Sequence, residues 1–240
     1  MLAAESVEDL WRIFTEAMAE TGFPRAIYGF TRDGVADALT DMGRVLFLSN
    51  HEPAYLEGFI GRGLYRDAPM VRWAADNVGA SSWRHVAEAY AAGELTEAER
   101  KVIDFNRKMG VNAGYSISFR DASTLSKGAL GLVGAPEATQ DEIDGLWERV
   151  GRTVLTTATV LHLRMSSFPH PKTTALTPRQ REALEWVAHG KTTQDIALLM
   201  GISVAMVEKH LRLARIALDV EKTSHAVAKA IRLNQIFLPG

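Results

Sequence analysis

The sequence contains no cysteine. This absence excludes a disulfide framework, thiolate zinc sites and a cysteine nucleophile, and it is typical of a protein from a reducing compartment. The chain also lacks a run of about 18 apolar residues, which a membrane-spanning helix requires. Its first residues carry acids where a signal peptide carries lysine or arginine. We therefore expect a cytoplasmic protein with no membrane partner.

Signatures of catalysis and metal binding are missing as well. The 7 histidines are scattered without the spacing of metal ligands, and no set of carboxylate, histidine and serine stands out. We expect no metal site, no cofactor and no enzymatic activity. The chain does have the composition of a globular protein, 47% apolar and 23% charged, and its 240 residues suffice for two modest domains.

The net charge of −2 conceals an asymmetry between the two ends of the chain. From His170 onward the chain carries 10 lysines and arginines against 6 acids, whereas the preceding residues carry 17 against 23. A basic tail on an acidic body is typical of a protein that meets phosphates at one end. Taken alone, chance variation in surface charge explains these numbers about equally well.

The segment 166–175 (SSFPHPKTTA) has the prolines and small polar residues of an inter-domain linker. It separates a front domain, residues 1–165, from a back domain, residues 176–240. In the front domain, periodicity predicts helices at 7–18, 53–62, 69–77, 95–109 and 153–165, and strands at 26–31, 44–49, 112–120 and 128–133. We expect an α+β protein: an N-terminal α/β/α sandwich with an antiparallel sheet, then an all-α four-helix domain.

Start and stop signals divide the back domain into four short helices. Thr177 caps the first, and Gln180 is placed to complete a capping box. Thr192 and Ser203 cap the second and third helices, and Gly201 makes the turn between them. This spacing predicts a helix-turn-helix fold.

The third of these helices has two distinct faces. Its apolar residues form one inner stripe, Val207, Leu211, Ala214 and Leu218, and a basic row lies outside. A basic row alone is more often an ordinary solvated face. Combined with the capped helices and the glycine turn, it predicts a recognition helix in the major groove of double-stranded DNA. The candidate DNA contacts are Val204, Ala205, Glu208 and Lys209 at base edges, and Arg212 and Arg215 at phosphates. Thr192, the cap of the second helix, is a further candidate DNA contact.

The stretch from Leu176 to Ile236 resembles the C-terminal domain of the LuxR family. It contains, in the family's order, an LTxR start, WxAxGKT, an IA pair, GIS, VxxHL and AVAKA. It departs from the family pattern at Gln180, Met206 and Ala217. The resemblance implies that the last helix pairs two such domains. Because one short helix reads only one half-site, we expect a homodimer on a palindromic promoter, with RNA polymerase as a further candidate partner.

The front domain resembles the acyl-homoserine-lactone binding domain of quorum-sensing receptors in the same family, over most of residues 5–165. The matching segments are YRDAPMVRWA, SSW and GVNAGYSISF. In that family a tryptophan follows an Asp-Pro pair at the interval that separates Pro69 from Trp83. A glycine that opens a strand falls at Gly114. The resemblance implies an enclosed apolar pocket for a small-molecule autoinducer.

The resemblance also implies the ligand contacts. Trp83 supplies an indole N–H to the ring carbonyl of the lactone, and an acid takes the amide N–H. The family's acid immediately precedes the proline, but here that residue is Ala68, and the only nearby carboxylate is Asp67. Tyr55 stands where the family has tryptophan, and Phe59 where it has tyrosine. The candidate ligand-binding residues are Trp83, Asp67, Tyr55, Phe59 and Gly114.

These altered contacts leave several interpretations open. Either Asp67 substitutes through a local shift of the chain, or the receptor takes an unusual acyl-homoserine lactone, another small molecule, or no ligand. By itself, an aromatic residue such as Trp83 or Phe59 is more often plain core. We expect a quorum-sensing transcriptional regulator. The alternatives are a regulator that responds to no lactone and an antagonist that heterodimerises with another receptor.

Overall fold

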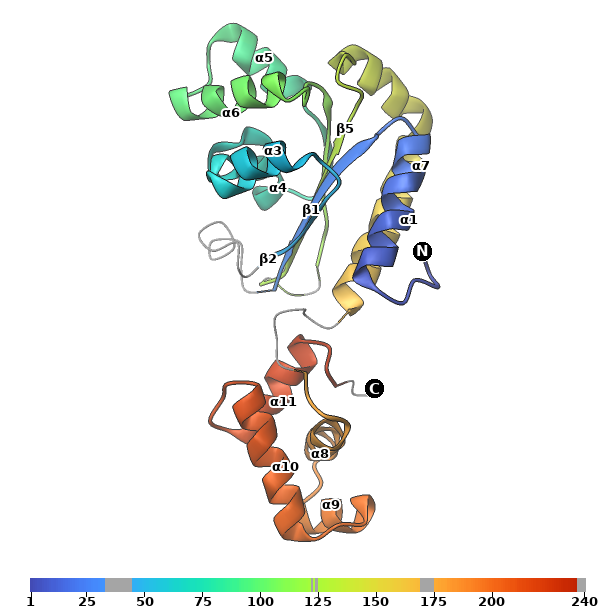
Figure 1. Cartoon of the computed structure of the whole chain (residues 1–240), viewed down its shortest axis with the longest axis vertical. Helices are drawn as coiled ribbons and strands as arrows, with labels where there is room; N and C mark the ends of the chain where they lie inside the picture. Colours follow the sequence, from blue (N-terminus) through green and yellow to red (C-terminus); the bar gives the residue numbers. More distant parts are fainter. Residues whose placement is uncertain (33–44, 122, 124, 169–174, 237–240) are drawn as a thin grey trace. The chain divides into compact units, whose positions relative to one another are not determined.

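The computed structural model describes residues 1–32, 45–121, 123, 125–168 and 175–236. The chain forms two compact units, Met1–Ser166 and Ser167–Gly240 (Figure 1). Most of the predicted linker, residues 169–174, lies outside the described residues, as does Arg44 of the second predicted strand. Within the described ranges, no helix combines the length and the apolar character needed to cross a membrane.

The first unit is built on a five-stranded sheet in the order β2-β1-β5-β4-β3. Every neighbouring pair is antiparallel, as predicted from the sequence. The central strands β1 and β5 pair along their whole lengths, from Arg25 opposite Val133 to Thr31 opposite Lys127. The strands are β1 (Arg25–Thr31), β2 (Val45–Ser49), β3 (Gly79–Ser82), β4 (Gly114–Ser118) and β5 (Lys127–Val133).

Helices cover both faces of this sheet, which confirms the predicted α/β/α sandwich (Figure 1). One face is covered by α1 (Val7–Glu20) and the long α7 (Gln140–Ser167). The other face carries a layer of shorter helices: α3 (Pro53–Leu56), a π-helical turn (Glu57–Gly61), a 3-10 turn (Leu64–Asp67), α4 (Pro69–Asp76), α5 (Arg84–Ala92) and α6 (Glu97–Lys108).

The α1/α7 side of the sheet is a closely packed core. Side chains of alternate sheet residues, among them Tyr28 and Leu132, are 0% exposed on this side. Tyr115 of β4 stacks on Trp147 of α7 with ring centroids 4.0 Å apart. Each large apolar side chain buried here stabilises the fold by about 1.5–3 kcal/mol. This face therefore holds the sheet rigid beneath the other helical layer.

Several elements of the first unit differ from the prediction. Strand β3 and helix α5 were not predicted, and the segment 53–62 changes from α-helix to a π-helical turn at Glu57. Helix α7 begins at Gln140 rather than near 153, and it continues through Ser166 and Ser167, which were assigned to the linker. The polar sequence of β3, GASS, has no apolar alternation, so only its pairing with β4 reveals it.

The second unit consists of the four predicted helices, α8 (Pro178–Ala188), α9 (Thr193–Met200), α10 (Val204–Ala217) and α11 (Thr223–Arg232). Thr177 and Gln180 form the predicted capping box, and Thr192 forms another with Asp195. Gly201 ends α9 with a φ of 64°, the left-handed conformation that glycine adopts without strain. The all-α helix-turn-helix fold is confirmed.

Candidate functional site

A pocket lies between the sheet and the layer of shorter helices. The cavity has a volume of about 170 Å³. Its wall is mostly apolar, and Tyr55, Phe59 and Trp83 of the predicted ligand site belong to it. The remaining lining residues are Ile27, Gly29, Phe30, Thr31, Val45, Phe47, Ile60, Tyr65, Met70, Val71, Ala74, Ala75, Asn106, Ser116, Lys127, Ala129, Leu130, Gly131 and Val133.

The pocket exists because the sheet carries small residues on this face. Gly29 of β1 lies opposite Ala129 of β5, and Gly131 follows two residues later along β5. Successive side chains of a strand point to opposite faces, so the bulky neighbours of these residues fill the α1/α7 side instead. The small side chains leave a hollow that the helical layer covers without filling.

Aromatic rings form one wall of the pocket. Tyr55 stacks on Phe59 with ring centroids 5.2 Å apart, and on Phe105 at 5.7 Å. The Tyr55 hydroxyl donates a hydrogen bond to Oδ1 of Asn106 at 3.3 Å. Burial raises the pKa of Tyr55 well above its usual value, and the positive charge of Arg25 opposes this only in part. The phenol therefore stays neutral and serves as a hydrogen-bond donor in the pocket.

Trp83 lies at one end of the pocket and is 6% exposed. Its indole Nε1 donates to Oγ of Ser116 at 2.9 Å, and its backbone N–H donates to the carbonyl of Gly114 at 3.1 Å. Gly114 opens β4 but does not line the pocket. A Cβ at this position would collide with the Leu132 carbonyl and lie 2.9 Å from the Trp83 ring. Gly114 thus allows the indole to pack directly against the strand.

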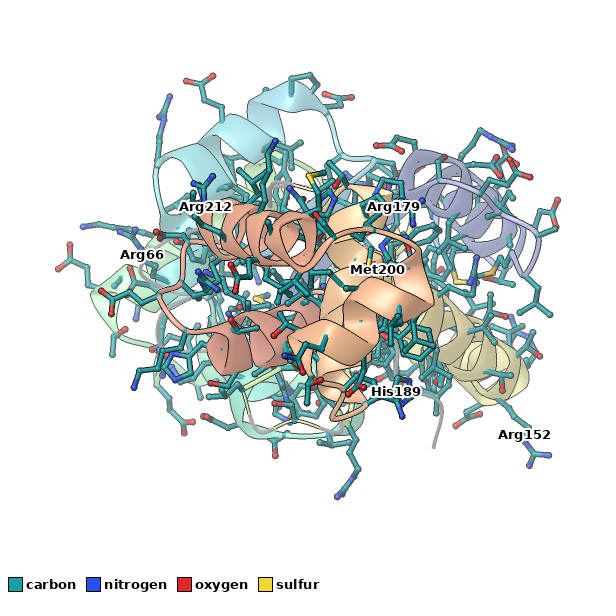
Figure 2. The ribbon with its side chains drawn as sticks, turned by 90° about the horizontal axis from the view of Figure 1, so that it is seen from below. Arg66, Arg152, Arg179, His189, Met200 and Arg212 are labelled. Carbon is teal, nitrogen blue, oxygen red and sulfur yellow. The ribbon has the colours of Figure 1, made fainter. Side chains whose placement is uncertain are left out.

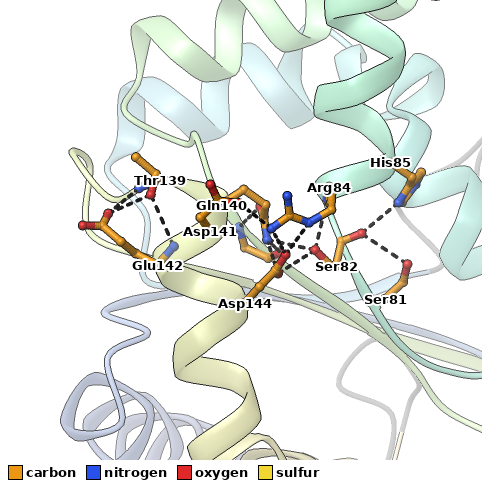
Figure 3. A network of polar contacts seen from close by, with 10 residues as sticks. Ser81, Ser82, Arg84, His85, Thr139, Gln140, Asp141, Glu142 and Asp144 are labelled. Atoms are coloured by element: carbon orange, nitrogen blue, oxygen red, sulfur yellow. Dashed lines mark hydrogen bonds and ion pairs between the residues drawn. The ribbon is translucent and has the colours of Figure 1, made fainter.

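A network of polar contacts fixes the backbone on either side of Trp83 (Figure 3). Arg84 forms ion pairs of 2.6 Å with both Asp141 and Asp144 of α7. The Ser82 hydroxyl donates to Asp144 at 2.7 Å, and the Gln140 amide donates to Ser82, to Asp144 and to the Gly114 carbonyl. This network ties the β3–α5 turn to the start of α7. It therefore sets the position of the indole.

Burial would raise the pKa of Asp144, but hydrogen bonds from Ser82, Gln140 and Arg84 outweigh burial and lower it. The carboxylate is therefore ionised at neutral pH, as its ion pair with Arg84 requires.

The structure does not bring Asp67 into the pocket. Its side chain is exposed at the end of the 3-10 turn, whereas Ala68 is completely buried beside the pocket wall. A residue before proline is held in the extended conformation, and Ala68 adopts it with φ −75° and ψ 118°. The inward position is thus occupied by alanine, and the structure gives no support to the suggestion that Asp67 replaces the family's acid. Among the described residues, no carboxylate lines the pocket.

Sequence reasoning missed several polar residues of the pocket, among them Asn106, Ser116 and Lys127. Ser116 carried a usable signal, because YSISF places serines on one face of a strand that is buried on both sides. Asn106 lies on the buried face of the amphipathic α6. Nothing in the local sequence distinguishes Lys127 from an ordinary surface lysine.

The predicted DNA-contacting residues of α10 share one face of that helix. Val207, Leu211 and Ala214 are buried against the rest of the unit. On the opposite side Val204, Ala205, Glu208, Lys209 and Arg212 are all exposed. Figure 2 shows the side chain of Arg212 extending away from the helical unit. The exposed face begins at the helix N-terminus, the end that enters the major groove in helix-turn-helix proteins.

Two of the predicted contacts already have partners within the protein. Arg215 is half-buried, and its Nη1 donates to Oγ1 of Thr223 at 2.9 Å. The Thr192 hydroxyl donates to the Asp195 carboxylate at 2.7 Å and accepts from its backbone N–H at 3.2 Å. Thr192 therefore stabilises the start of α9, and Arg215 ties α10 to α11.

A helix-turn-helix unit with an exposed basic face, joined to an α/β/α unit with an internal apolar pocket, defines a transcriptional regulator with a small-molecule binding domain. Residues 6–165 match the autoinducer binding domain family, and residues 174–218 match region 4 of sigma-70. The chain belongs to the LuxR family of quorum-sensing transcriptional regulators. Its relatives are regulators rather than enzymes.

Individual relatives agree with this assignment. The chain is 25% identical to the transcriptional activator SolR of Ralstonia nicotianae over 238 residues, which cover 97% of this chain and 94% of that one. It is also 25% identical to a HTH-type transcriptional regulator of Sinorhizobium fredii, covering 79% of this chain and 56% of the longer relative. The structure of SdiA from Escherichia coli has the same fold, with a TM-score of 0.54, 16% identity and coverage of 99% and 94%.

Proposed function

We propose that this regulator binds an N-acyl-homoserine lactone in the pocket of its first unit and palindromic promoter DNA, as a homodimer, through α10. The single observation that carries the ligand proposal is the apolar pocket with Trp83 at one end. A fatty chain needs such an apolar slot, and the indole N–H, which donates to Ser116, is placed to donate to a ligand carbonyl instead. Tyr55 and Phe59 supply the adjoining aromatic wall.

The DNA proposal rests on the exposed face of α10. Lys209 and Arg212 make no ion pair with the described residues, so their charges are available for DNA phosphates. Val204, Ala205 and Glu208 lie nearer the helix N-terminus, where side chains reach base edges. Arg215 reaches a phosphate if it releases Thr223, and Thr192 contributes chiefly by capping α9.

The homodimer proposal draws on apolar side chains that the second unit leaves exposed. Ile216 near the end of α10 is 63% exposed, and Ile231 of α11 is 39% exposed. A two-fold pair of such units would bury these residues and present two copies of α10 to two half-sites. RNA polymerase remains a candidate partner of the DNA-bound dimer.

Thermal unfolding of the full chain against a series of acyl-homoserine lactones tests the ligand proposal. Binding to the folded state raises the melting temperature by mass action, so a rise that depends on chain length is the expected result. Trp83→Phe removes the indole donor and should reduce the rise. A flat response from a stable chain that still binds DNA would contradict the lactone proposal.

A gel shift on promoter fragments tests the DNA proposal. The variant Lys209→Ala/Arg212→Ala should lose the shift, because two positively charged contacts to DNA disappear. Arg179→Ala is a matched control, since Arg179 lies on α8 and pairs with Glu182 on the surface (Figure 2). Retained binding by the double variant would contradict the choice of α10 as the recognition helix.

A second candidate function is a LuxR-type regulator that needs no lactone. The observation that favours it is the buried Ala68 at the position of the family's acid, which leaves the amide N–H of a lactone without a carboxylate. In that case the wild-type chain binds DNA with the same affinity in the presence and absence of every lactone. An antagonist that acts only by heterodimerising would give no gel shift on its own.

A further inference from the structure

The floor of the pocket is elongated along strands β1 and β5, and its two ends are lined by different residues. Three rungs of the β1–β5 ladder cross it, Ile27 opposite Gly131, Gly29 opposite Ala129, and Thr31 opposite Lys127. The first rung lies at the Trp83 end, because a Cβ on Gly131 would be 3.9 Å from Cζ2 of the indole. Gly131 and Lys127 are four positions apart along an antiparallel strand, a distance of about 13 Å. A ligand lying along this floor therefore has one end at Trp83 and the other at Lys127.

The two ends of this floor differ in chemistry. At the Trp83 end the polar groups are neutral: the indole N–H, the Ser116 hydroxyl and the Tyr55 hydroxyl. The middle rung has no polar side chain. At the far end stands Lys127, and among the described residues it is the only charged side chain in the pocket wall.

Lys127 has unused capacity for hydrogen bonding. Its Nζ donates to the backbone carbonyl of Asn77 at 2.6 Å, and no ion pair joins it to a described residue. An ammonium group has three N–H donors, so a neutral carbonyl leaves two of them available. Partial burial lowers the pKa of Lys127, and the more distant charges of Asp121 and Asp76 oppose that effect. An anionic oxygen in the pocket would compensate this partly buried charge better than an alkyl end does.

We propose that the pocket selects an acyl ligand whose chain ends in a carboxylate, with the acyl head at Trp83 and the carboxylate on Nζ of Lys127. The inference rests on the proposed function, because it concerns the same pocket, and it narrows the class of ligand. A chain that ends in a methyl group would leave the ammonium facing apolar atoms. The carboxylate forms a charge-assisted hydrogen bond at the same place.

The test compares two lactones that differ only at the chain terminus, N-decanoyl-homoserine lactone and the same molecule with a carboxylate as its last carbon. Dissociation constants are measured by titration calorimetry with the full chain. We expect the carboxylate form to bind about 10-fold tighter or better, the range of a hydrogen bond to a charged group. Lys127→Met should reverse the preference, whereas Lys127→Arg should keep it.

Lys108→Met is the matched control, because Lys108 is an exposed lysine of the same unit that does not line the pocket. It should retain the wild-type preference. The preference of each variant is the ratio of its dissociation constants for the two ligands. A general loss of stability affects both constants equally and leaves this ratio unchanged. Ala129→Leu fills the floor of the pocket and should weaken the binding of both ligands. This variant separates binding in the pocket from adsorption to the surface.

The outcomes distinguish the two proposals. If the methyl-terminated lactone binds as well as the carboxylate form, or if the preference survives in Lys127→Met, the inference about Lys127 is overturned while the lactone proposal stands. If neither lactone binds, the lactone proposal fails. The same comparison is then made with methyl decanoate and the monomethyl ester of decanedioic acid, which lack the lactone. If the monomethyl ester of decanedioic acid binds no more tightly than methyl decanoate, the inference about Lys127 is overturned as well.

Discussion

His51 should make the stability of the first unit sensitive to acid. The ring follows β2, is 6% exposed and stacks on the pocket residue Tyr55 with centroids 4.5 Å apart. Its Nδ1 lies 3.0 Å from Oγ of Ser49, whereas Nε2 is buried and has no hydrogen-bond partner among the described residues. Burial and then the charge of Arg25 lower the pKa of His51 from 6.5 to about 4, against the opposing hydrogen bond with Ala26.

The sign of the effect follows from proton uptake. The unfolded chain protonates this histidine near pH 6.5, and the folded chain does so only near pH 4. Between these values the unfolded state binds more protons, so the free energy of unfolding falls as the pH is lowered from 6.5 towards 4. With these pKa values the loss attributable to His51 between pH 7.5 and pH 5.0 is about 2 kcal/mol.

Urea unfolding of the full chain at pH 7.5 and pH 5.0, followed by tryptophan fluorescence, measures this loss. His51→Gln keeps a polar side chain but cannot titrate, so its stability should fall by about 2 kcal/mol less than that of the wild type between the two pH values. His85→Gln is the control, because His85 is exposed in the same unit. The same pH dependence in all three proteins would refute the assignment to His51.

Three further predictions concern the pocket and the DNA-binding unit. Gly114→Ala should lower the free energy of unfolding by about 3 kcal/mol, because the added Cβ collides with the adjacent strand. Gly145→Ala, with nothing within 4 Å of the added Cβ, should stabilise α7 by about 0.5–1 kcal/mol. Similar melting temperatures for the two variants would contradict this packing argument. Ser116→Ala leaves the Trp83 indole N–H buried without its acceptor and should cost about 1–3 kcal/mol in urea unfolding. The same substitution should cost less in a Trp83→Phe background, and an equal cost would disprove the coupling. Thr192→Ala breaks the capping box and should cost about 1 kcal/mol of the unfolding free energy of the second unit, measured by circular dichroism. Thr192→Ser keeps the hydroxyl and should be nearly neutral, so an equal loss in both would argue against capping.

The second unit was predictable from sequence because its boundaries are set locally. Thr177, Thr192 and Ser203 each bond to a backbone N–H three residues ahead, so each helix start is determined within one turn. The apolar stripe of α10 has the helical period in the sequence itself. Helix α6 also begins at a local signal, a capping box that joins Thr96 to Glu99.

Elements that depend on distant partners could not be predicted in this way. Helix α7 extends back to Gln140, although Gly145 and Gly151 weaken the helical pattern of its first half. That half is held by the Arg84 ion pairs and by the stacking of Trp147 on Tyr115, which join residues far apart in the chain. These tertiary contacts override the weak local preference.

The pocket also combines features set by local sequence with features set by distant contacts. The sequence alone determined that an indole is present at Trp83 and that the residue immediately before Pro69 is not an acid. Only the tertiary structure decided that Ala68 points inward while Asp67 faces solvent, and that Ser116 accepts from the indole. It also decided that Lys127 stands at the far end of the floor. Strand pairing, which joins residues widely separated in sequence, sets these positions, and local periodicity carries no information about it.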